Sequence, residues 1–353
     1  MNILDKSKLR PQILDIMEDI EKVSVKATEE FLKKKENQGV DFRVIWKKVA
    51  MGNTRALKGE NMHGYMSKEE QIFLAKFFRH SVEYRSTYLQ KYVSPVSKDV
   101  ICTQVNAGGV AAEWQSFPSA KNDTVFLYFH GGGYIMGSPN FRRLLTINLS
   151  KITNMRVLSV DYRLAPENPY PAGLEDCISV YKWLLSCGYK PNNIIIGGDS
   201  AGGYFTIMTL VNLRNDGIPL PAGAVCFAPA TDLTLKSESY FKNASTDPIL
   251  SNLGIFWWAE SFLAGKDPHS VSPLHVNLSG LPPILIQVST SEMLFNDSTR
   301  FAERAKAAGV DITLQTWDDT LHVFQDFDLP ESTEALVKIK EFIQRHISSI
   351  NYS

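Results

Sequence analysis

Residues 193–204 read Asn-Ile-Ile-Ile-Gly-Gly-Asp-Ser-Ala-Gly-Gly-Tyr, a buried strand pattern that runs directly into a glycine-rich turn and then a helix pattern. Ser200 stands at the centre of the pentapeptide Gly-Asp-Ser-Ala-Gly, residues 198–202. A serine at the tip of such a turn is held in a strained conformation that projects its hydroxyl above the sheet. The pentapeptide alone is weak evidence for catalysis, because a glycine-rich turn without any chemical role has the same composition. The rest of the chain has to supply its partners.

Composition and charge describe an ordinary globular protein. The chain has 353 residues, of which 44% are hydrophobic, and this is ample for a buried core. The 37 basic and 38 acidic side chains give a formal net charge of −1. This balance gives no basic surface for nucleic acid or anionic lipid, so a small-molecule ligand is the expected partner.

The amino-terminal residues are charged and lack the apolar segment of a signal peptide, and no stretch offers about 18 uncharged apolar residues. We therefore expect a cytoplasmic protein without a membrane span. Four cysteines are scattered without a C-x-x-C pair, at Cys102, Cys177, Cys187 and Cys226. This spacing indicates neither a disulfide framework nor a metal site, and no cofactor motif is present.

Residues 96–353 show the pattern of a doubly wound α/β domain. A hairpin is expected over residues 99–117, followed by uniformly apolar strands at 124–129, 156–160, 193–196, 223–227, 283–288 and 311–317. Helical patterns lie between them near 141–154, 172–186, 201–215, 296–308 and 333–347. Apolar strands that alternate with helices predict a mostly parallel sheet covered on both faces.

Residues 1–95 look different, because their apolar residues recur at helical spacing and no strand pattern precedes residue 99. We expect helices over about 8–36 and 67–92. About 55 residues also separate the strands at 223–227 and 283–288, which is too long for a simple connection. This insertion, about 235–275, carries several aromatic residues and is expected to meet the N-terminal helices at the carboxyl edge of the sheet.

A serine hydroxyl becomes a useful nucleophile only when an imidazole accepts its proton and a carboxylate orients that imidazole. His322 lies in a loop after the strand at 311–317, where it could reach Ser200, and it follows both serine and acid in the chain. The other histidines except His130 are most simply surface or packing residues: His63, His80, His269, His275 and His346. His322 is therefore the predicted base.

Two acids compete for the third position. Glu292 stands at the tip of the strand at 283–288, whereas Asp297 falls in the first turn of the next helix, where an acid commonly stabilises the helix end. We predict Glu292, with Asp297 as the alternative.

Residues 128–134, Tyr-Phe-His-Gly-Gly-Gly-Tyr, follow another strand with three consecutive glycines. Ester hydrolysis places negative charge on a carbonyl oxygen, and backbone N–H groups are the usual donors that stabilise it. Such donors come from the residue after the nucleophile, here Ala201, and from an H-G-G-G loop. We therefore predict an oxyanion hole from Ala201 with Gly131, Gly132 or Gly133, and His130 as a loop-positioning residue.

Four segments together resemble the hormone-sensitive lipase family of α/β-hydrolases, in its microbial esterase branch: H-G-G-G-Y (130–134), D-Y-R-L-A-P-E (161–167), P-Y-P-A-G-L-E-D (169–176) and G-D-S-A-G-G (198–203). The resemblance spans residues 100–345. It implies an α/β-hydrolase fold with about eight strands, a helical cap, and a carboxylesterase of short- to medium-chain acyl or aryl esters. Ser200, His322 and Glu292 match the catalytic positions, although the family acid is more often Asp in a D-P-L context. Homodimers are common in the family, although no residue here indicates one.

The charges of Asp161, Arg163 and Glu167 are close in sequence and opposite in sign, so we expect them to form an ion-pair network that holds a loop. Two other functions fit the sequence less well. Plant gibberellin receptors of the same family lack the catalytic histidine, so His322 argues against a receptor. Neither nucleotide-binding glycine motif, G-x-G-x-x-G or G-x-x-x-x-G-K-[ST], occurs in the sequence.

Overall fold

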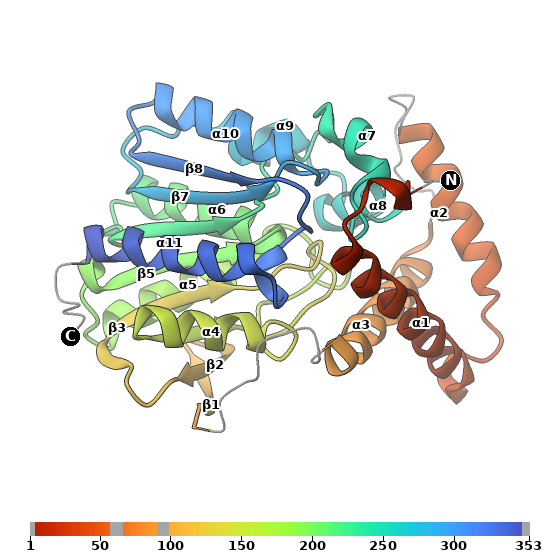
Figure 1. Cartoon of the computed structure of the whole chain (residues 1–353), viewed down its shortest axis with the longest axis horizontal. Coiled ribbons are helices and arrows are strands. Elements are labelled where there is room, and N and C mark those ends of the chain that lie inside the picture. The colour runs from red at the N-terminus through yellow and green to blue at the C-terminus, as the bar shows by residue number, and fades with distance from the viewer. Residues whose placement is uncertain (1–3, 57–65, 90–98, 251, 348–353) are drawn as a thin grey trace.

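A computed structural model describes residues 4–56, 66–89, 99–250 and 252–347. Its centre is an eight-stranded sheet with the strand order β1-β2-β4-β3-β5-β6-β7-β8 (Figure 1). The strands are β1 (Ile101–Ala107), β2 (Val110–Ser116), β3 (Lys121–Phe129), β4 (Met155–Val160), β5 (Ile194–Asp199), β6 (Gly223–Phe227), β7 (Ile284–Ser289) and β8 (Ile312–Trp317). The predicted fold class is confirmed, and each predicted strand is present with ends that differ by a few residues.

The sheet is antiparallel at one edge and parallel elsewhere. The β1–β2 hairpin pairs Ala107 with Val110 across a two-glycine turn, and β2 also runs antiparallel to β4. From β4 onward all neighbouring pairs are parallel, so the carboxyl ends of β3, β5, β6, β7 and β8 meet at one edge. Loops that carry chemistry gather at this edge in open parallel sheets.

Helices cover both faces, as the uniformly apolar strands require. Side chains of α4 (Arg143–Thr153) and α11 (Pro330–His346) share one buried cluster with Phe126, Val157 and Val225. The opposite face packs against α5 (Ala172–Ser186), α6 (Ala201–Asn215) and α10 (Phe295–Ala307) through residues such as Val180 and Phe301. The carboxyl edge of the sheet therefore rests on a core that is buried on both sides.

Three N-terminal helices lie beyond one end of the sheet: α1 (Pro11–Lys33), α2 (Phe42–Ala56) and α3 (Lys68–Leu89) (Figure 1). The helices α1 and α3 correspond to the two helical stretches expected from the sequence, although the expected residues 90–92 lie outside the described residues. The helix α2 was not predicted, because only Ile45 and Val49 of its described side chains are fully buried hydrophobics. Its apolar stripe is correspondingly short.

The long insertion folds as α7 (Ser239–Lys242), α8 (Asn252–Leu263) and α9 (Pro268–Val271). It meets the N-terminal helices as expected. The ring of Phe78 in α3 stacks on Trp257 in α8, with centroids 5.7 Å apart, and contacts Trp258 edge-on at 5.8 Å. Aromatic pairs of this kind stabilise the packing beyond the effect of the area that they bury. The two segments therefore form one packed layer over the carboxyl edge.

The expected network among Asp161, Arg163 and Glu167 is wrong. Arg163 pairs instead with Asp176, with Nη2 2.8 Å from Oδ1, and Glu167 pairs with Arg79 of α3 at 2.8 Å. Charged residues that are close in sequence do not pair with one another here. Asp176 is 13 positions from Arg163, and Arg79 is 88 positions from Glu167.

Candidate active site

Ser200 lies at the sharp turn between β5 and α6. Its backbone has φ 55° and ψ −115°, in a region that non-glycine residues rarely adopt. Its amide donates to the carbonyl of Phe227 at 2.8 Å, and its carbonyl accepts from the amides of Tyr204 and Ala230. The surrounding structure therefore holds the strained conformation, as expected for a functional residue.

The glycines beside Ser200 are required by close approach of the backbone. A Cβ at position 202 would overlap the carbonyl oxygen of Phe129, at the end of β3. A Cβ at position 198 would meet both that oxygen and the backbone of residue 202. The turn can therefore sit against β3 only because these two positions lack side chains.

His322 and Glu292 form a buried pair. The Nδ1 atom of His322 lies 2.8 Å from Oε1 of Glu292, and the second carboxylate oxygen accepts from the amide of Ser289 at 3.1 Å. Burial lowers the pKa of His322, but the adjacent Glu292 carboxylate, together with the charges of Asp247 and Asp199, outweighs burial, so the pKa is raised above its ordinary value. A carboxylate on Nδ1 leaves Nε2 as the nitrogen that can face a substrate.

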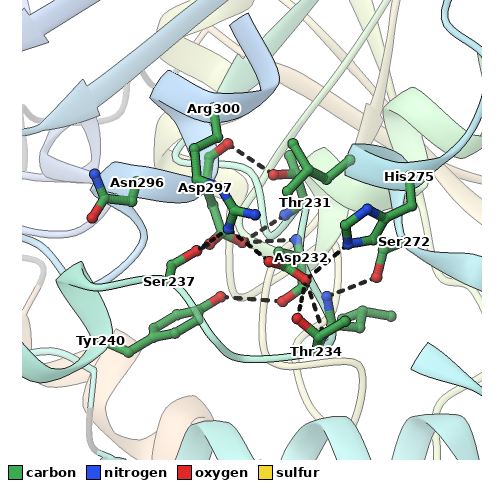
Figure 2. A network of polar contacts seen from close by, with 12 residues as sticks. Thr231, Asp232, Thr234, Ser237, Tyr240, Ser272, His275, Asn296, Asp297 and Arg300 are labelled. Atoms are coloured by element: carbon green, nitrogen blue, oxygen red, sulfur yellow. Dashed lines mark hydrogen bonds and ion pairs between the residues drawn. The ribbon is translucent and has the colours of Figure 1, made fainter. Parts of the chain in front are cut away.

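Asp297, the alternative acid, belongs to a different cluster (Figure 2). Its carboxylate accepts from the amides of Thr231 and Asp232 at 2.8 and 2.9 Å, and from the hydroxyl of Ser237 at 2.9 Å. Burial raises its pKa to about 7. Asp297 therefore holds the loop after β6, and within the described residues no hydrogen bond or ion pair joins it to His322.

The glycine loop is fixed to the serine turn by Asp199. The amide of Gly131 donates to Oδ1 of Asp199 at 2.8 Å, and the hydroxyl of Tyr128 donates to the same oxygen at 2.6 Å. Gly132 has φ +125°, and a Cβ there would overlap the carbonyl oxygen of Met136. The N–H of Gly131 is thus committed to Asp199. Within the described residues, the amides of Gly132, Gly133 and Ala201 have no protein acceptor.

His130 lies in the interior beside this loop. Its ring stacks on Tyr162, with centroids 4.2 Å apart, and Nδ1 lies 2.8 Å from the carbonyl oxygen of Gly131. Burial lowers the pKa of His130 to about 4, so the imidazole is neutral near pH 7. These contacts fit a residue that supports the loop.

A buried charge cluster lies behind Ser200. Arg142 pairs with Asp199, with Nη2 2.6 Å from Oδ2, and also with Asp326. Nothing in the sequence pattern pointed to Arg142 or to the structural role of Asp199, because 57 positions separate them.

Asp247 in the insertion makes a similar contact between segments that are distant in sequence. It accepts from the amide of Met293 at 2.8 Å and so ties the insertion to the residue after Glu292.

Two cavities meet at Ser200. The smaller, about 40 Å³, is lined by apolar residues that include Leu235, Ile255 and Leu294. The larger, about 240 Å³, is lined by Ser200, His322 and both unbonded glycines, together with aromatic residues of the N-terminal helices and α8. The structure thus brings the predicted serine and histidine to the wall of one cavity, together with Gly132 and Gly133.

In the part of the chain that the structure describes, no group of three His, Cys, Asp or Glu side chains could hold a metal ion. No described helix is long and apolar enough to cross a membrane.

Comparison with known proteins gives consistent results. A family model described as the alpha/beta hydrolase fold matches residues 126–326. An acetyl-hydrolase of Streptomyces hygroscopicus is 36% identical over 68% of this chain and 81% of its own length. An esterase of Acinetobacter venetianus is 37% identical over 70% of this chain and 83% of its own length.

Solved structures agree with the sequence relatives. A crystal structure of an esterase from the bacterial hormone-sensitive lipase family superposes with a TM-score of 0.73 and 38% identity, over 87% of this chain and 99% of that one. A hormone-sensitive lipase from a metagenome library superposes with a TM-score of 0.72 and 36% identity, over 80% of this chain and 99% of that one.

Proposed function

This chain belongs to the hormone-sensitive lipase family of α/β hydrolases and is a carboxylic ester hydrolase, and on that premise we propose that Ser200, His322 and Glu292 form its catalytic triad. The observation that carries the proposal is the 2.8 Å contact between His322 and Glu292, with His322 and Ser200 on the wall of the same cavity. The preferred substrates are esters with short acyl chains.

The reaction has two halves. Ser200 Oγ attacks the ester carbonyl carbon while Nε2 of His322 accepts the hydroxyl proton, and Glu292 stabilises the imidazolium through Nδ1. The tetrahedral intermediate expels the alcohol, which receives that proton from His322, and leaves an acyl group on Ser200. Water then attacks the acyl-enzyme with the same proton transfers, releasing the acid and restoring the serine.

Negative charge on the carbonyl oxygen needs preorganised donors. The amides of Gly132, Gly133 and Ala201 suit this task, because each is without a protein acceptor among the described residues. Ala201 is the first residue of α6, where a helix leaves its N–H groups unbonded. The N–H of Gly131 drops out of the predicted donor set, since Asp199 accepts from it.

The position of His322 supports an assignment of the two halves of the ester to the two cavities. The leaving alcohol must take its proton from His322, which lines the larger cavity and is absent from the lining of the smaller one. The alcohol part therefore occupies the larger cavity, and the acyl chain occupies the small apolar one. A volume of about 40 Å³ fits an acyl group of few carbons, consistent with the name of the Streptomyces relative.

The test is a series of p-nitrophenyl esters from acetate to decanoate, with Ser200→Ala beside the parent protein. We expect kcat/KM to be highest for acetate to butyrate. Ser200→Ala should lose about three to six orders of magnitude in kcat. Circular dichroism and thermal unfolding of Ser200→Ala provide the folding control.

Two results would contradict the proposal. Turnover by Ser200→Ala near that of the parent would exclude Ser200 as the nucleophile. A preference for octanoate or decanoate would exclude the small cavity as the acyl site.

A further inference from the structure

Arg85 is a cation in the larger cavity that has no counterion among the described residues. It lies on α3 and lines the larger cavity together with Ser200 and His322, and it also lines an adjoining cavity of about 280 Å³. Within the described residues, no hydrogen bond or ion pair joins the Arg85 guanidinium to another group. Arginine in a partly desolvated site is ordinarily paired, so the missing partner needs an explanation.

The carboxylates near this site have other partners. Asp326, which lines the adjoining cavity, is ion-paired to Arg142, as is Asp199. Glu83, two residues before Arg85 on α3, accepts instead from the hydroxyl of Ser138 and the side-chain amide of Asn140, at 2.7 and 2.8 Å. Among the residues that the structure describes, the cavity thus presents Arg85 as a cation whose charge no side chain neutralises directly.

The surroundings of Arg85 make an unpaired charge costly. The larger cavity is lined mainly by apolar and aromatic side chains, namely Trp46, Phe78, Val82, Met136, Phe141 and Ile249. Although Arg85 is only half-buried, desolvation and the nearby charge of Arg142 lower its pKa to about 10. It is still a cation at neutral pH, and an anion bound beside it would recover part of this cost.

We propose that Arg85 binds a carboxylate on the alcohol part of the ester, so that the preferred substrates are short-chain acyl esters of hydroxy acids. The inference rests on the proposed function, because it uses the assignment of the larger cavity to the leaving alcohol. Ser200 takes the short acyl group, and the hydroxy acid leaves as the alcohol product after its carboxylate has been bound to Arg85 during this step. One water then takes the acyl group from Ser200 and releases it as the short-chain acid. The planar guanidinium can donate two parallel N–H bonds to such a carboxylate.

The experiment compares acids with neutral isosteres. The substrates are 3- and 4-acetoxybenzoate and the corresponding acetoxybenzamides, with each kcat/KM divided by the rate constant for hydroxide hydrolysis of the same ester. The enzymes are the parent, Arg85→Met, Arg85→Lys and the matched control Arg43→Met, whose arginine is exposed on α2 and lines neither cavity.

For at least one isomer, we expect the acid-to-amide ratio to fall by about 10- to 100-fold in Arg85→Met, chiefly through KM. Arg85→Lys should retain part of the preference, because it keeps the charge and loses the planar fork. Arg43→Met should keep the parent ratio. Equal ratios in the parent and Arg85→Met for both isomers would overturn the inference while leaving the esterase function intact.

A binding measurement separates the two proposals. Calorimetric titration of 4-hydroxybenzoate and 3-hydroxybenzoate into Ser200→Ala should show binding that Ser200→Ala/Arg85→Met weakens by a similar factor. If Arg85→Met weakens this binding but the parent hydrolyses no ester, the anion site is supported and the proposed function is rejected. Binding of both acids that is unaffected by Arg85→Met would reject the anion site.

Discussion

The backbone N–H of Gly131 donates to the carboxylate of Asp199 at 2.8 Å. Asp199 immediately precedes Ser200, so the residue that leads into the nucleophile also holds the loop that carries Gly132 and Gly133. The other carboxylate oxygen of Asp199 is 2.6 Å from Nη2 of Arg142. The serine turn and the glycine loop are therefore positioned relative to one another by a single buried side chain.

Asp199→Asn should destabilise the protein. The amide would keep the shape of the side chain but remove the charge opposite Arg142 and place an N–H donor near that guanidinium. Breaking a buried pair in this way costs about 3–5 kcal/mol. We expect a value near the lower end of this range, because Arg142 keeps its second partner, Asp326. Urea unfolding at pH 7 measures the free energy of unfolding, and kcat should also fall, by up to about 100-fold, as the loop shifts.

The matched control is Asp216→Asn, at the residue that follows α6. Asp216 pairs with Lys182 at 3.6 Å, and both side chains are about half exposed. A surface pair of this kind contributes at most about 1 kcal/mol. Equal losses in the two variants would contradict the role assigned to Asp199.

The two candidate acids should separate cleanly. Glu292→Gln removes the carboxylate that holds His322 and should lower kcat by about 10²- to 10⁴-fold with little loss of stability. Asp297→Asn should instead lower the melting temperature and leave kcat within a few-fold of the parent, because its bonds hold the loop after β6. Steady-state kinetics and thermal unfolding of both variants decide between them, and an active Glu292→Gln would reverse the assignment.

The pH dependence of kcat/KM should follow His322, which must be neutral to accept the serine proton. Because Glu292 raises the pKa of His322 above its ordinary value of 6.5, activity should fall as pH drops through a midpoint above 6.5. Glu292→Gln removes the largest raising effect and leaves burial opposed only by the charges of Asp247 and Asp199, so the midpoint should move to lower pH. A midpoint that is unchanged in Glu292→Gln would show that another group controls the profile.

The small cavity should set the acyl-chain limit. Ile255→Ala removes three carbons from its wall and should raise the kcat/KM ratio of hexanoate to acetate esters by about tenfold, the value of one or two methylenes in a pocket. The control is Ile16→Ala, which truncates a buried isoleucine of α1 in another cluster. Both variants lose stability, and only Ile255→Ala should change the ratio.

The sequence was sufficient for features encoded by neighbouring residues. The strand, turn and helix around Ser200 could be predicted because glycine spacing and apolar runs are local signals. The order of serine, acid and histidine along the chain also limited which histidine could act, and the structure brings His322 to the cavity that contains Ser200.

Features that depend on distant residues were not predictable in the same way. The partners of Arg163 and Glu167 lie on α5 and α3, and proximity in sequence suggested the wrong pairs. Gly131 could not be distinguished from Gly132 and Gly133 until Asp199 was seen to accept its N–H. Arg85 stood out only after the carboxylates around it were matched with other partners, since a lone arginine in a helix carries no pattern.

Arg79 of α3 constrains how substrates enter. Its guanidinium donates four hydrogen bonds, to the carbonyl oxygens of Ile135 and Ala165 and to both carboxylate oxygens of Glu167. A hinged opening of α3 would break all four together and pull on the segment that follows the three glycines. We therefore expect substrate to enter the larger cavity without an opening of α3.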